Sequence, residues 1–444
     1  MQAPFDIAAD LHTPVSAYLR LKTLHPRYLL ESVEGGAQGR YSFIGFGAAS
    51  RVTLGDDEHP LINLRSALAN AAECGPSIAG QPFSGGLVGV TSFDFVRRLY
   101  RLPEAPHPTS VPLGTYMTTE SILVFDHLTR RIALLHSGSE QDRQALRREV
   151  IGTLRGPIEN GHVAGAHTDP TPSMSKEEFM HSVGKTKKYI QAGDVYQLVL
   201  SIKFAGTTEL EPFVAYRALR LLNPSPYMYY LDFDDLQVVG SSPEALVKLR
   251  GSTAELRPIA GTRPRGADEA ADQLLERELL ADSKEAAEHV MLVDLARNDL
   301  GRTAAAGSVE VDPYRIIERY SHVMHLVSGV TGELRGDLDS FDLFAATFPA
   351  GTVSGAPKLA AIELIDELEP VNRDLYSGSI GYFGHGGSMD QAITIRTMVF
   401  SEGQYSYQAG AGIVADSDPE REHEEVLSKA AVLQAALDLA KEGL

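Results

Sequence analysis

Two pairs of glutamates stand three positions apart, each in a segment with the pattern of a helix. Glu285 and Glu288 lie in SKEAAEHVMLVDL, while Glu422 and Glu425 lie in DPEREHEEVLSKA, where Lys429 follows Glu425 by four positions. Residues at these spacings share one helix face, and like charges there repel unless a cation joins them. Two such faces could converge on a divalent cation, and an all-oxygen donor set favours Mg²⁺. The alternative is a solvated surface helix in each case.

Two further segments could hold an anion. Arg396 lies in QAITIRTMVF, whose alternating apolar residues predict a strand with Arg396 in its middle. An arginine there must face solvent, an acid or an anionic ligand. Gly410, Ala411 and Gly412 follow QYSYQ, which predicts a strand ending in a turn with exposed backbone N–H groups. An exposed sheet face and an ordinary tight turn are the simpler alternatives.

Three single residues could also carry chemistry. His325 lies in YSHVMHLVSG, an apolar run with a helix-like pattern, where a hydrogen-bonded core histidine is the simplest interpretation. Gln197 shares one face of a predicted strand with Val199 and Ser201. Cys74 is the single cysteine, which excludes a disulfide framework and a thiolate metal cluster. Its context, AECGPS, lacks the glycine that a nucleophile turn would favour before the thiol, so we expect a structural thiol.

The composition limits the possible partners. The chain has 444 residues and a net charge of −19, which argues against nucleic acid as a partner. An anionic ligand must then be held by local arginine, lysine and backbone N–H groups. No run of 18 apolar residues occurs, so we expect no membrane span, and the N-terminus has no secretory signal pattern. We therefore expect a cytoplasmic protein.

Strands and helices come in separate runs, which predicts an α+β fold with mainly antiparallel sheets. A long helix is expected over residues 276–299, and another begins with Asp418 as its N-cap. Residues 152–175 are rich in Gly, Pro, Ser and Thr and read as a linker. We place a domain boundary there, which gives domains of residues 1–165 and 166–444.

The motifs of this chain, in their order and in their amino-acid sequences, resemble those of a known family. PIAGTRPRG, LLADSKEAAEHVMLVDLARNDLGR, FPAGTVSGAPK, YSGSIGY, GAGIVADSDPE and EHEEVLSKA together look like the chorismate-binding enzymes. The resemblance covers residues 175–440, and RYLLESVEGGAQGRYSFIG and NPSPYMYYLDF extend it toward the anthranilate synthase component I members. It implies a two-domain α/β body with large, mainly antiparallel sheets and an active site in the cleft between them.

The resemblance also implies roles for individual residues. Glu288 and Glu425 match the family's magnesium ligands, and Glu285 and Glu422 match positions that act through water. His325 matches a catalytic histidine and Glu244 a general acid, whose pKa we expect to be raised by burial. The chorismate contacts match the following residues: Gly261, Thr262, Tyr376, Arg396, Gly410, Ala411, Gly412 and Lys429.

Two positions distinguish the chemistries within the family. Relatives that add water carry a lysine base where this chain has Gln197, so the resemblance implies ammonia as the nucleophile. Relatives that make aminodeoxychorismate carry a nucleophilic lysine where this chain has Ala260. The implied activity is the Mg²⁺-dependent conversion of chorismate and ammonia to anthranilate and pyruvate, in tryptophan biosynthesis. Aminodeoxychorismate synthase component I is the alternative enzyme, and a non-enzymatic ligand-binding protein is the alternative class.

The resemblance implies a partner and a regulator as well. Ammonia would come from glutamine through a separate amidotransferase subunit, in a heterotetramer, because this chain has no candidate glutaminase cysteine. L-tryptophan would inhibit the enzyme from a site in the N-terminal sheet region. The matching residues are Ser32 of LLES and the Pro224, Ser225 and Pro226 turn of NPSPYM.

Overall fold

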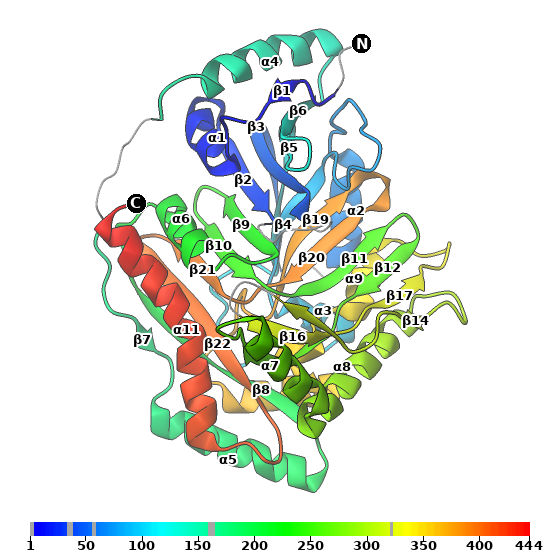
Figure 1. Ribbon diagram of the computed structural model, residues 1–444, viewed down its shortest axis with the longest axis vertical. Coiled ribbons are helices and arrows are strands. Elements are labelled where there is room, and N and C mark those ends of the chain that lie inside the picture. The colour runs from blue at the N-terminus through cyan, green and yellow to red at the C-terminus, as the bar shows by residue number, and fades with distance from the viewer. Residues whose placement is uncertain (1–3, 33–38, 56–58, 159–164, 320–322) are drawn as a thin grey trace.

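The computed structural model describes residues 4–32, 39–55, 59–158, 165–319 and 323–444 (Figure 1). Its helices are α1 (Pro14–Arg20), α2 (Pro60–Asn70), α3 (Phe95–Tyr100), α4 (Glu140–Leu154), α5 (Lys176–Ala192), α6 (Pro212–Leu222), α7 (Glu269–Ala281), α8 (Ser283–Gly301), α9 (Ser340–Thr347), α10 (Lys358–Leu368) and α11 (Pro419–Glu442), with the 3-10 helices η1 (Leu21–Leu24), η3 (Gly351–Val353) and η4 (His385–Gly387). None of the helices in these ranges is long and apolar enough to cross a membrane.

Most strands hydrogen bond into one large network: β1 (Ile7–Ala8), β2 (Pro26–Glu31), β3 (Tyr41–Leu54), β4 (Gly86–Thr91), β5 (Gly114–Asp126), β6 (Arg131–His136), β7 (Thr171–Pro172), β8 (Gln197–Thr207), β9 (Tyr227–Asp232), β10 (Gln237–Ser242), β11 (Ala245–Arg250), β12 (Thr253–Leu256), β14 (Glu310–Val311), β17 (Val330–Glu333), β18 (Gly355–Ala356), β19 (Ser379–Gly384), β20 (Met389–Ile393), β21 (Thr397–Ser401) and β22 (Gln404–Ile413). A separate three-stranded sheet contains β13 (Ile259–Pro264), β16 (Val323–Val327) and β15 (Ile316–Arg319). The helices lie around these mainly antiparallel sheets, which confirms the predicted α+β class.

The large sheet runs through both predicted domains. β2 pairs with β3 of the N-terminal part and with β9 of the C-terminal part. Likewise, β4 lies between β5 and β19. In the predicted linker, α4 extends to Leu154, and residues 159–164 lie outside the described ranges. The division near residue 165 stays a prediction, but hydrogen bonds of a shared sheet cross it.

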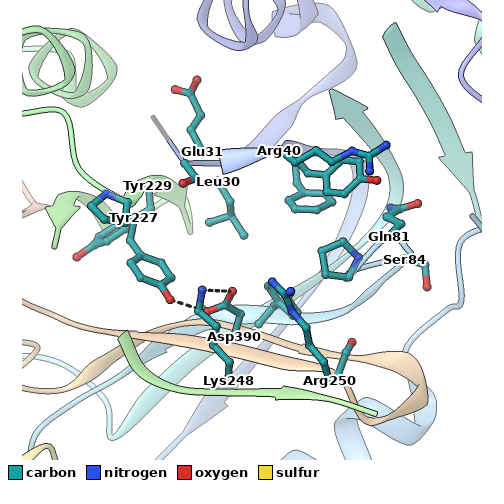
Figure 2. Close-up of a pocket in the computed structure, with 18 of the residues that line it drawn as sticks. Leu30, Glu31, Arg40, Gln81, Ser84, Tyr227, Tyr229, Lys248, Arg250 and Asp390 are labelled. Atoms are coloured by element: carbon teal, nitrogen blue, oxygen red, sulfur yellow. Dashed lines mark hydrogen bonds and ion pairs between the residues drawn. The ribbon is translucent and has the colours of Figure 1, made fainter. Parts of the chain in front are cut away.

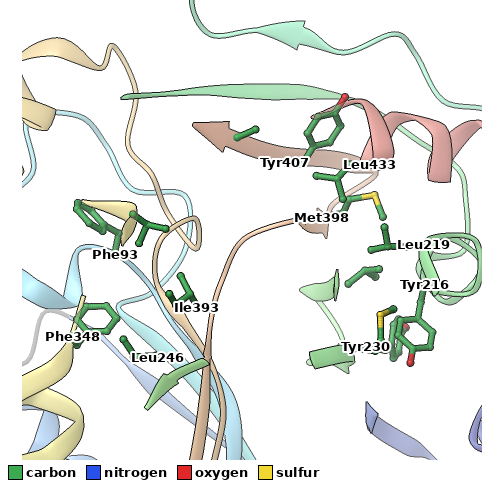
Figure 3. Close-up of a cluster of buried hydrophobic side chains, with 14 of the residues drawn as sticks. Phe93, Tyr216, Leu219, Tyr230, Leu246, Phe348, Ile393, Met398, Tyr407 and Leu433 are labelled. Carbon is green, nitrogen blue, oxygen red and sulfur yellow. The ribbon is translucent and has the colours of Figure 1, made fainter. Parts of the chain in front are cut away.

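Apolar side chains of helices α6 and α11 cover one part of the sheet. Leu219 of α6 and Leu433 of α11 are fully buried in one cluster with Tyr230, Met398 and Tyr407 of the strands (Figure 3). α11 also packs against β22 along its length (Figure 1). This packing fixes the face of α11 that carries Glu422, Glu425 and Lys429 relative to the glycines of β22.

Four local predictions were wrong, and in two of them, at His325 and at Gly410–Gly412, long-range strand pairing overrides a local pattern. The expected helix over 276–299 is two helices, because Asp282 ends α7 and caps α8. His325 lies on β16, paired with β13, and not in a helix-like run. Gly410–Gly412 do not form a turn but continue β22, paired with β8. Arg396 does not lie in mid-strand: it falls between β20 and β21 with a left-handed φ of 49°.

Candidate active site

The first glutamate pair is held at the start of α8. The Asp282 carboxylate accepts hydrogen bonds from the backbone N–H groups of Lys284 (3.0 Å) and Glu285 (3.1 Å), so the helix begins at a defined residue. Glu285 lies 3.4 Å from the Arg263 guanidinium, and Glu288 follows one turn later on the same face. The helical spacing predicted from the sequence is therefore confirmed for this pair.

The second pair is held at the start of α11. Asp418 caps this helix and Pro419 occupies its first turn, as predicted. Lys429 forms an ion pair with Glu425 at 2.7 Å and donates a hydrogen bond to the Gly410 carbonyl at 3.0 Å. Through this one ammonium group, the glutamate face of α11 is tied to the glycine segment of β22.

The two glutamate pairs lie within each other's electrostatic field. Burial raises the pKa of Glu288, and the negative charges of Glu285 and Glu425 raise it further. Burial and Glu425 also raise the pKa of Glu422, while Lys284 and Lys429 oppose the rise. In the described part of the chain, no three His, Cys, Asp or Glu residues are close enough to chelate an ion as they stand. The donor chemistry nevertheless fits a hard divalent cation, because only carboxylates converge and their repulsion would be relieved by positive charge.

Next to α11, which contributes Lys429 to its lining, is a cavity of about 150 Å³, which we call the small cavity. Six of the predicted residues line it: Glu244, Tyr376, Arg396, Gly410, Gly412 and Lys429. Gln197 and Ala411 are not among its lining residues, and the Ala411 side chain is buried in the apolar core. The structure thus brings together residues that are up to 185 positions apart, since Glu244 lies beside Lys429.

The glycines of β22 form one wall of the small cavity. A Cβ on Gly410 would lie 2.6 Å from the Tyr376 hydroxyl and 2.7 Å from the Leu200 carbonyl oxygen. A Cβ on Gly412 would lie 2.7 Å from Nε2 of Gln197. Any larger residue would collide with its neighbours at either position. The Gln197 side chain therefore lies behind this wall and contacts Gly412.

Two opposite charges face the small cavity without being paired. Burial raises the pKa of Glu244 to about 7, as expected from the sequence, and the nearby Thr352, Lys429 and Arg396 only partly offset the rise. Burial lowers the pKa of Arg396, and Glu244 opposes that change. Among the described residues, the Arg396 guanidinium has no carboxylate within ion-pair distance and no side-chain hydrogen bond. A half-buried guanidinium without an ion-pair partner is suited to bind an anion.

His325 lies on the separate three-stranded sheet, opposite Thr262 in the β13–β16 pairing. Its Nδ1 atom is 3.1 Å from the Gly261 carbonyl oxygen and 3.1 Å from the Thr262 hydroxyl. A carbonyl can only accept, so Nδ1 donates, and a neutral ring then has its lone pair on Nε2. Burial lowers the pKa of His325, and the positive charge of Arg396 lowers it further. None of the three residues His325, Gly261 and Thr262 lines the small cavity. Even so, Arg396 of that cavity is close enough to His325 to lower its pKa.

Gly261 joins this sheet to α8. Its φ of +63° is left-handed, a conformation that favours glycine. A Cβ there would lie 2.8 Å from Leu279 and 3.1 Å from Oε2 of Glu285. The PIAGT motif therefore needs a glycine here because of the left-handed φ and because of the short distances to Leu279 and Glu285. The carbonyl oxygen of Gly261 contacts His325, so this glycine lies between His325 and Glu285.

A second opening of about 520 Å³, the large cavity, is lined by residues of β2, β3, β9, β11, β19 and β20 (Figure 2). Ser32 and Pro226 of the predicted tryptophan site line it. Pro224 and Ser225 do not: Ser225 is buried and its hydroxyl lies 2.9 Å from the Ser241 hydroxyl. Ser225 therefore supports the turn from inside rather than facing a ligand.

A charged cluster forms one wall of the large cavity. The Asp390 carboxylate lies 3.5 Å from the Lys248 ammonium and accepts a hydrogen bond from the Tyr227 hydroxyl at 2.9 Å (Figure 2). The Lys248 ammonium also lies 5.2 Å from the centre of the Tyr227 ring. This cluster links β9, β11 and β20.

Sequence reasoning assigned no role to two polar residues of the small cavity, Thr352 and Gln408. Thr352 lies within FPAGTVSGAPK, a motif that was recognised only as a whole. Gln408 precedes the glycine segment, and its Nε2 atom donates to the Ser201 hydroxyl at 2.8 Å. The alternation of β22 could have placed Gln408 on the same face as Gly410 and Gly412.

Comparisons with known proteins agree with this geometry. Residues 25–435 match the chorismate binding enzyme family. Anthranilate synthase component 1 of Thermus thermophilus is 44% identical over 98% of this chain and 97% of its own length, and that of Aquifex aeolicus is 43% identical over 98% and 94%. The crystal structure of anthranilate synthase component I from Streptococcus pneumoniae superposes with a TM-score of 0.81 at 34% identity, covering 98% of this chain and all of that one. The chain belongs to the chorismate binding enzyme family, among its anthranilate synthase component 1 members.

Proposed function

We propose that this chain converts chorismate and ammonia to anthranilate and pyruvate. The observation that carries the proposal is the small cavity, where a carboxyl with a pKa of about 7 lies beside an unpaired, half-buried arginine. Chorismate has two carboxylates and a hydroxyl leaving group, so it needs both anion-binding groups and an acid. Arg396 offers a planar fork for one carboxylate, and Lys429 adds a second positive charge. These local charges act against a chain whose net charge is −19.

Glu244 is the acid that assists departure of the hydroxyl. Its carboxyl donates a proton to the C4 hydroxyl oxygen as the C–O bond breaks and water leaves, while ammonia forms its bond at C2. The raised pKa keeps about half of the Glu244 side chains protonated near pH 7. Gln197 has no basic group, so a nucleophile that needs deprotonation, such as water, is disfavoured.

His325 assists the loss of pyruvate. Its Nδ1 atom donates a hydrogen bond to the Gly261 carbonyl oxygen, which fixes the orientation of the ring. Burial and Arg396 keep the ring neutral at physiological pH. A neutral imidazole can accept the proton that C2 loses when the ring becomes aromatic and pyruvate departs.

The proposed cofactor is Mg²⁺. Glu288 and Glu425 would hold it, with Glu285 and Glu422 acting through water; the support is that Glu425 of α11 is close enough to raise the pKa of Glu288 of α8. When bound, Mg²⁺ supplies positive charge for the ring carboxylate of chorismate. In addition, Lys429 is already in contact with Glu425 and with the Gly410 carbonyl, so it connects the glutamates to the small cavity.

Glutamine-derived ammonia would come from a separate amidotransferase subunit, and a heterotetramer is the proposed assembly. Cys74 is buried, and burial raises the pKa of its thiol to about 12. A thiol with that pKa is almost wholly protonated at neutral pH and is a poor nucleophile. The chain alone should therefore use ammonia and not glutamine.

L-tryptophan is the proposed feedback inhibitor, bound in the large cavity. The cavity has room for an indole, and Ser32 and Pro226 line it at a distance from the glutamates. Strands β11 and β20 run from its charged wall to Glu244 and toward Arg396, which gives a physical connection between the two sites.

One assay tests the activity and separates it from the alternatives. The purified chain is mixed with chorismate, ammonium and Mg²⁺, and anthranilate is followed by its fluorescence. We expect Mg²⁺-dependent anthranilate with ammonium and none with glutamine alone. Accumulation of aminodeoxychorismate would instead support the synthase of that compound, which Ala260 argues against, and no product at all would support a binding protein.

A further inference from the structure

Glu244 faces two cavities rather than one. Glu244 and Thr352 line both the small cavity and a second cavity of about 40 Å³, which we call the inner cavity. The inner cavity is lined by residues of α8, β11 and the segment that follows α9, and none of the β22 glycines lines it. Glu244 and Thr352 therefore connect the proposed substrate site to a second space, open to solvent, that the proposed mechanism does not use.

A buried ion pair lies at the inner cavity. Asp299, near the end of α8, lines the cavity, and its carboxylate lies 3.3 Å from the Lys358 ammonium. The side chains of both residues are about nine-tenths buried. Lys358 also donates to the Thr347 carbonyl oxygen at 3.2 Å. Burial raises the pKa of Asp299, whereas Lys358 and Arg302 oppose the rise.

The proposed reaction leaves Glu244 without its proton at the end of each turnover. The proton has gone to the hydroxyl oxygen, which left as water, and the Glu244 carboxylate then lies buried between Arg396 and Lys429. While substrate or product fills the small cavity, access from that side is blocked. A second route to Glu244 would allow its carboxylate to be reprotonated before the small cavity empties.

We propose that the inner cavity is the route by which Glu244 regains its proton, and that the Asp299–Lys358 pair supplies it. The inference rests on the proposed function, in which Glu244 is the acid. A proton from solvent reaches Asp299, which Lys358 holds in place, and passes through water in the inner cavity to the Glu244 carboxylate. The ammonium group formed at C2 loses one proton to solvent, so amination with loss of water consumes no net proton. Asp299 touches neither substrate nor reacting atoms, so it is a positioning and relay residue.

The dimensions and the lining groups are suited to this role. A buried water needs roughly 10–15 Å³ of such space and two to four polar partners, and the inner cavity has about 40 Å³. The carboxyl groups of Glu244 and Asp299 and the hydroxyl of Thr352 provide those partners. The Thr352 hydroxyl is close enough to lower the pKa of Glu244. Yet it has no well-aligned hydrogen bond to any described residue, so it can bond to water.

A purely structural pair would behave differently from a relay. If Asp299 and Lys358 only anchor α8 to the segment that carries Thr352, then replacing Asp299 slows every turnover alike. If they instead reprotonate Glu244, replacing Asp299 leaves the first turnover normal, because Glu244 starts protonated. Only the later turnovers are then slow. Rapid mixing resolves the first turnover from the steady state.

The test compares Asp299→Asn with Asp94→Asn by rapid mixing well below the pKa of Glu244, where nearly all Glu244 side chains start protonated. Asp94 is a matched control: it is also buried, has a raised pKa and pairs with an arginine, Arg97, at 2.8 Å, but lines neither cavity. For Asp299→Asn we expect a wild-type first-turnover rate, a burst of about one anthranilate per active site, and a steady-state rate lower by about tenfold or more. For Asp94→Asn we expect no such separation. First-turnover and steady-state rates of Asp299→Asn that both match wild type, or that fall together, would overturn the relay.

A cavity-filling variant keeps the test valid if Asp299→Asn does not fold. Ala296→Val adds two methyl groups to a residue that lines the inner cavity, and Ala440→Val is its control in a buried helix position away from both cavities. We expect the burst for Ala296→Val only, and its absence in a folded variant would contradict the route. The wild-type trace tests the proposed function separately. No product there overturns both proposals, whereas a normal wild-type trace with no burst in the variants overturns the relay alone.

Discussion

The small cavity and the large cavity each have a buried or half-buried cation in their lining, and they hold it in opposite ways. In the large cavity, Lys248 is compensated by Asp390 at 3.5 Å, and Tyr227 completes the cluster. In the small cavity, Arg396 has no partner at ion-pair distance in the described part of the chain, and Glu244 is neutral about half the time near pH 7. The contrast is therefore between Lys248, whose charge is paired, and Arg396, whose charge is not.

This difference suits two different tasks. A reaction needs groups whose charge is completed only by the substrate, so burial without a partner is useful in the small cavity. The proposed regulatory site must instead be stable when empty, and an internally paired wall meets that requirement. β11 connects the two cavities, because Glu244 directly precedes this strand and Lys248 and Arg250 lie farther along it.

The largest effect on one cavity alone is expected for Glu244→Gln. Glutamine has nearly the same shape but cannot give up a carboxylic proton, so we expect kcat to fall by about 10²–10⁴-fold. Tryptophan binding in the large cavity should not change. Anthranilate fluorescence measures the first quantity. Indole fluorescence of the ligand measures the second, because the chain has no tryptophan of its own. Near-normal turnover of this variant would remove Glu244 from the mechanism.

The next largest effect is expected at the glutamate faces of α8 and α11. Glu288→Gln or Glu425→Gln removes a charged oxygen ligand, so activity at limiting Mg²⁺ should collapse. The melting temperature should stay constant or rise, because the repulsion that raises the pKa of Glu288 is relieved. Glu424→Gln is the control, since Glu424 is an exposed carboxylate on the same helix. Wild-type Mg²⁺ dependence in the first two variants would refute the ligand assignment.

The local features of this site could be predicted from the sequence, and the long-range ones could not. Spacing alone placed Glu285 with Glu288, and capping residues placed the start of α11, because helix periodicity and caps depend on neighbours within a few positions. The elements around His325 and Gly410 were misassigned, because β16 and the end of β22 exist only through pairing with distant strands. The inner cavity had no sequence signal, since its walls come from α8, β11 and the segment after α9.

A smaller effect is expected when pH is varied: the pH dependence of turnover tests the role of Glu244 in the small cavity. Glu244 must be protonated to act, and its pKa is raised to about 7, so kcat measured at constant free ammonia should fall as pH rises through that value. The folded state also binds this proton more tightly than the unfolded state. The contribution of Glu244 to stability is therefore lost as pH rises from the usual glutamate range through about 7. Glu244→Gln should lack both dependences, and a wild-type profile without the fall would contradict the acid role.

The smallest expected effect concerns the link between the two cavities. Ser32→Ala removes one hydroxyl from the lining of the large cavity, and one hydrogen bond is worth about 0.5–1.5 kcal/mol, so tryptophan should bind about 2–12-fold more weakly. The kcat without tryptophan should not change, because Ser32 does not line the small cavity. Thermodynamic reciprocity requires that chorismate weaken tryptophan binding by the factor by which tryptophan weakens chorismate binding, typically about 5–150-fold. Ser225→Ala is the matched comparison: its hydroxyl is buried against Ser241, so it should alter stability and not a direct ligand contact. Titration of tryptophan fluorescence with and without chorismate measures both quantities. Binding that ignores both chorismate and the loss of the Ser32 hydroxyl would separate the two cavities energetically, and the large cavity would then need a different ligand.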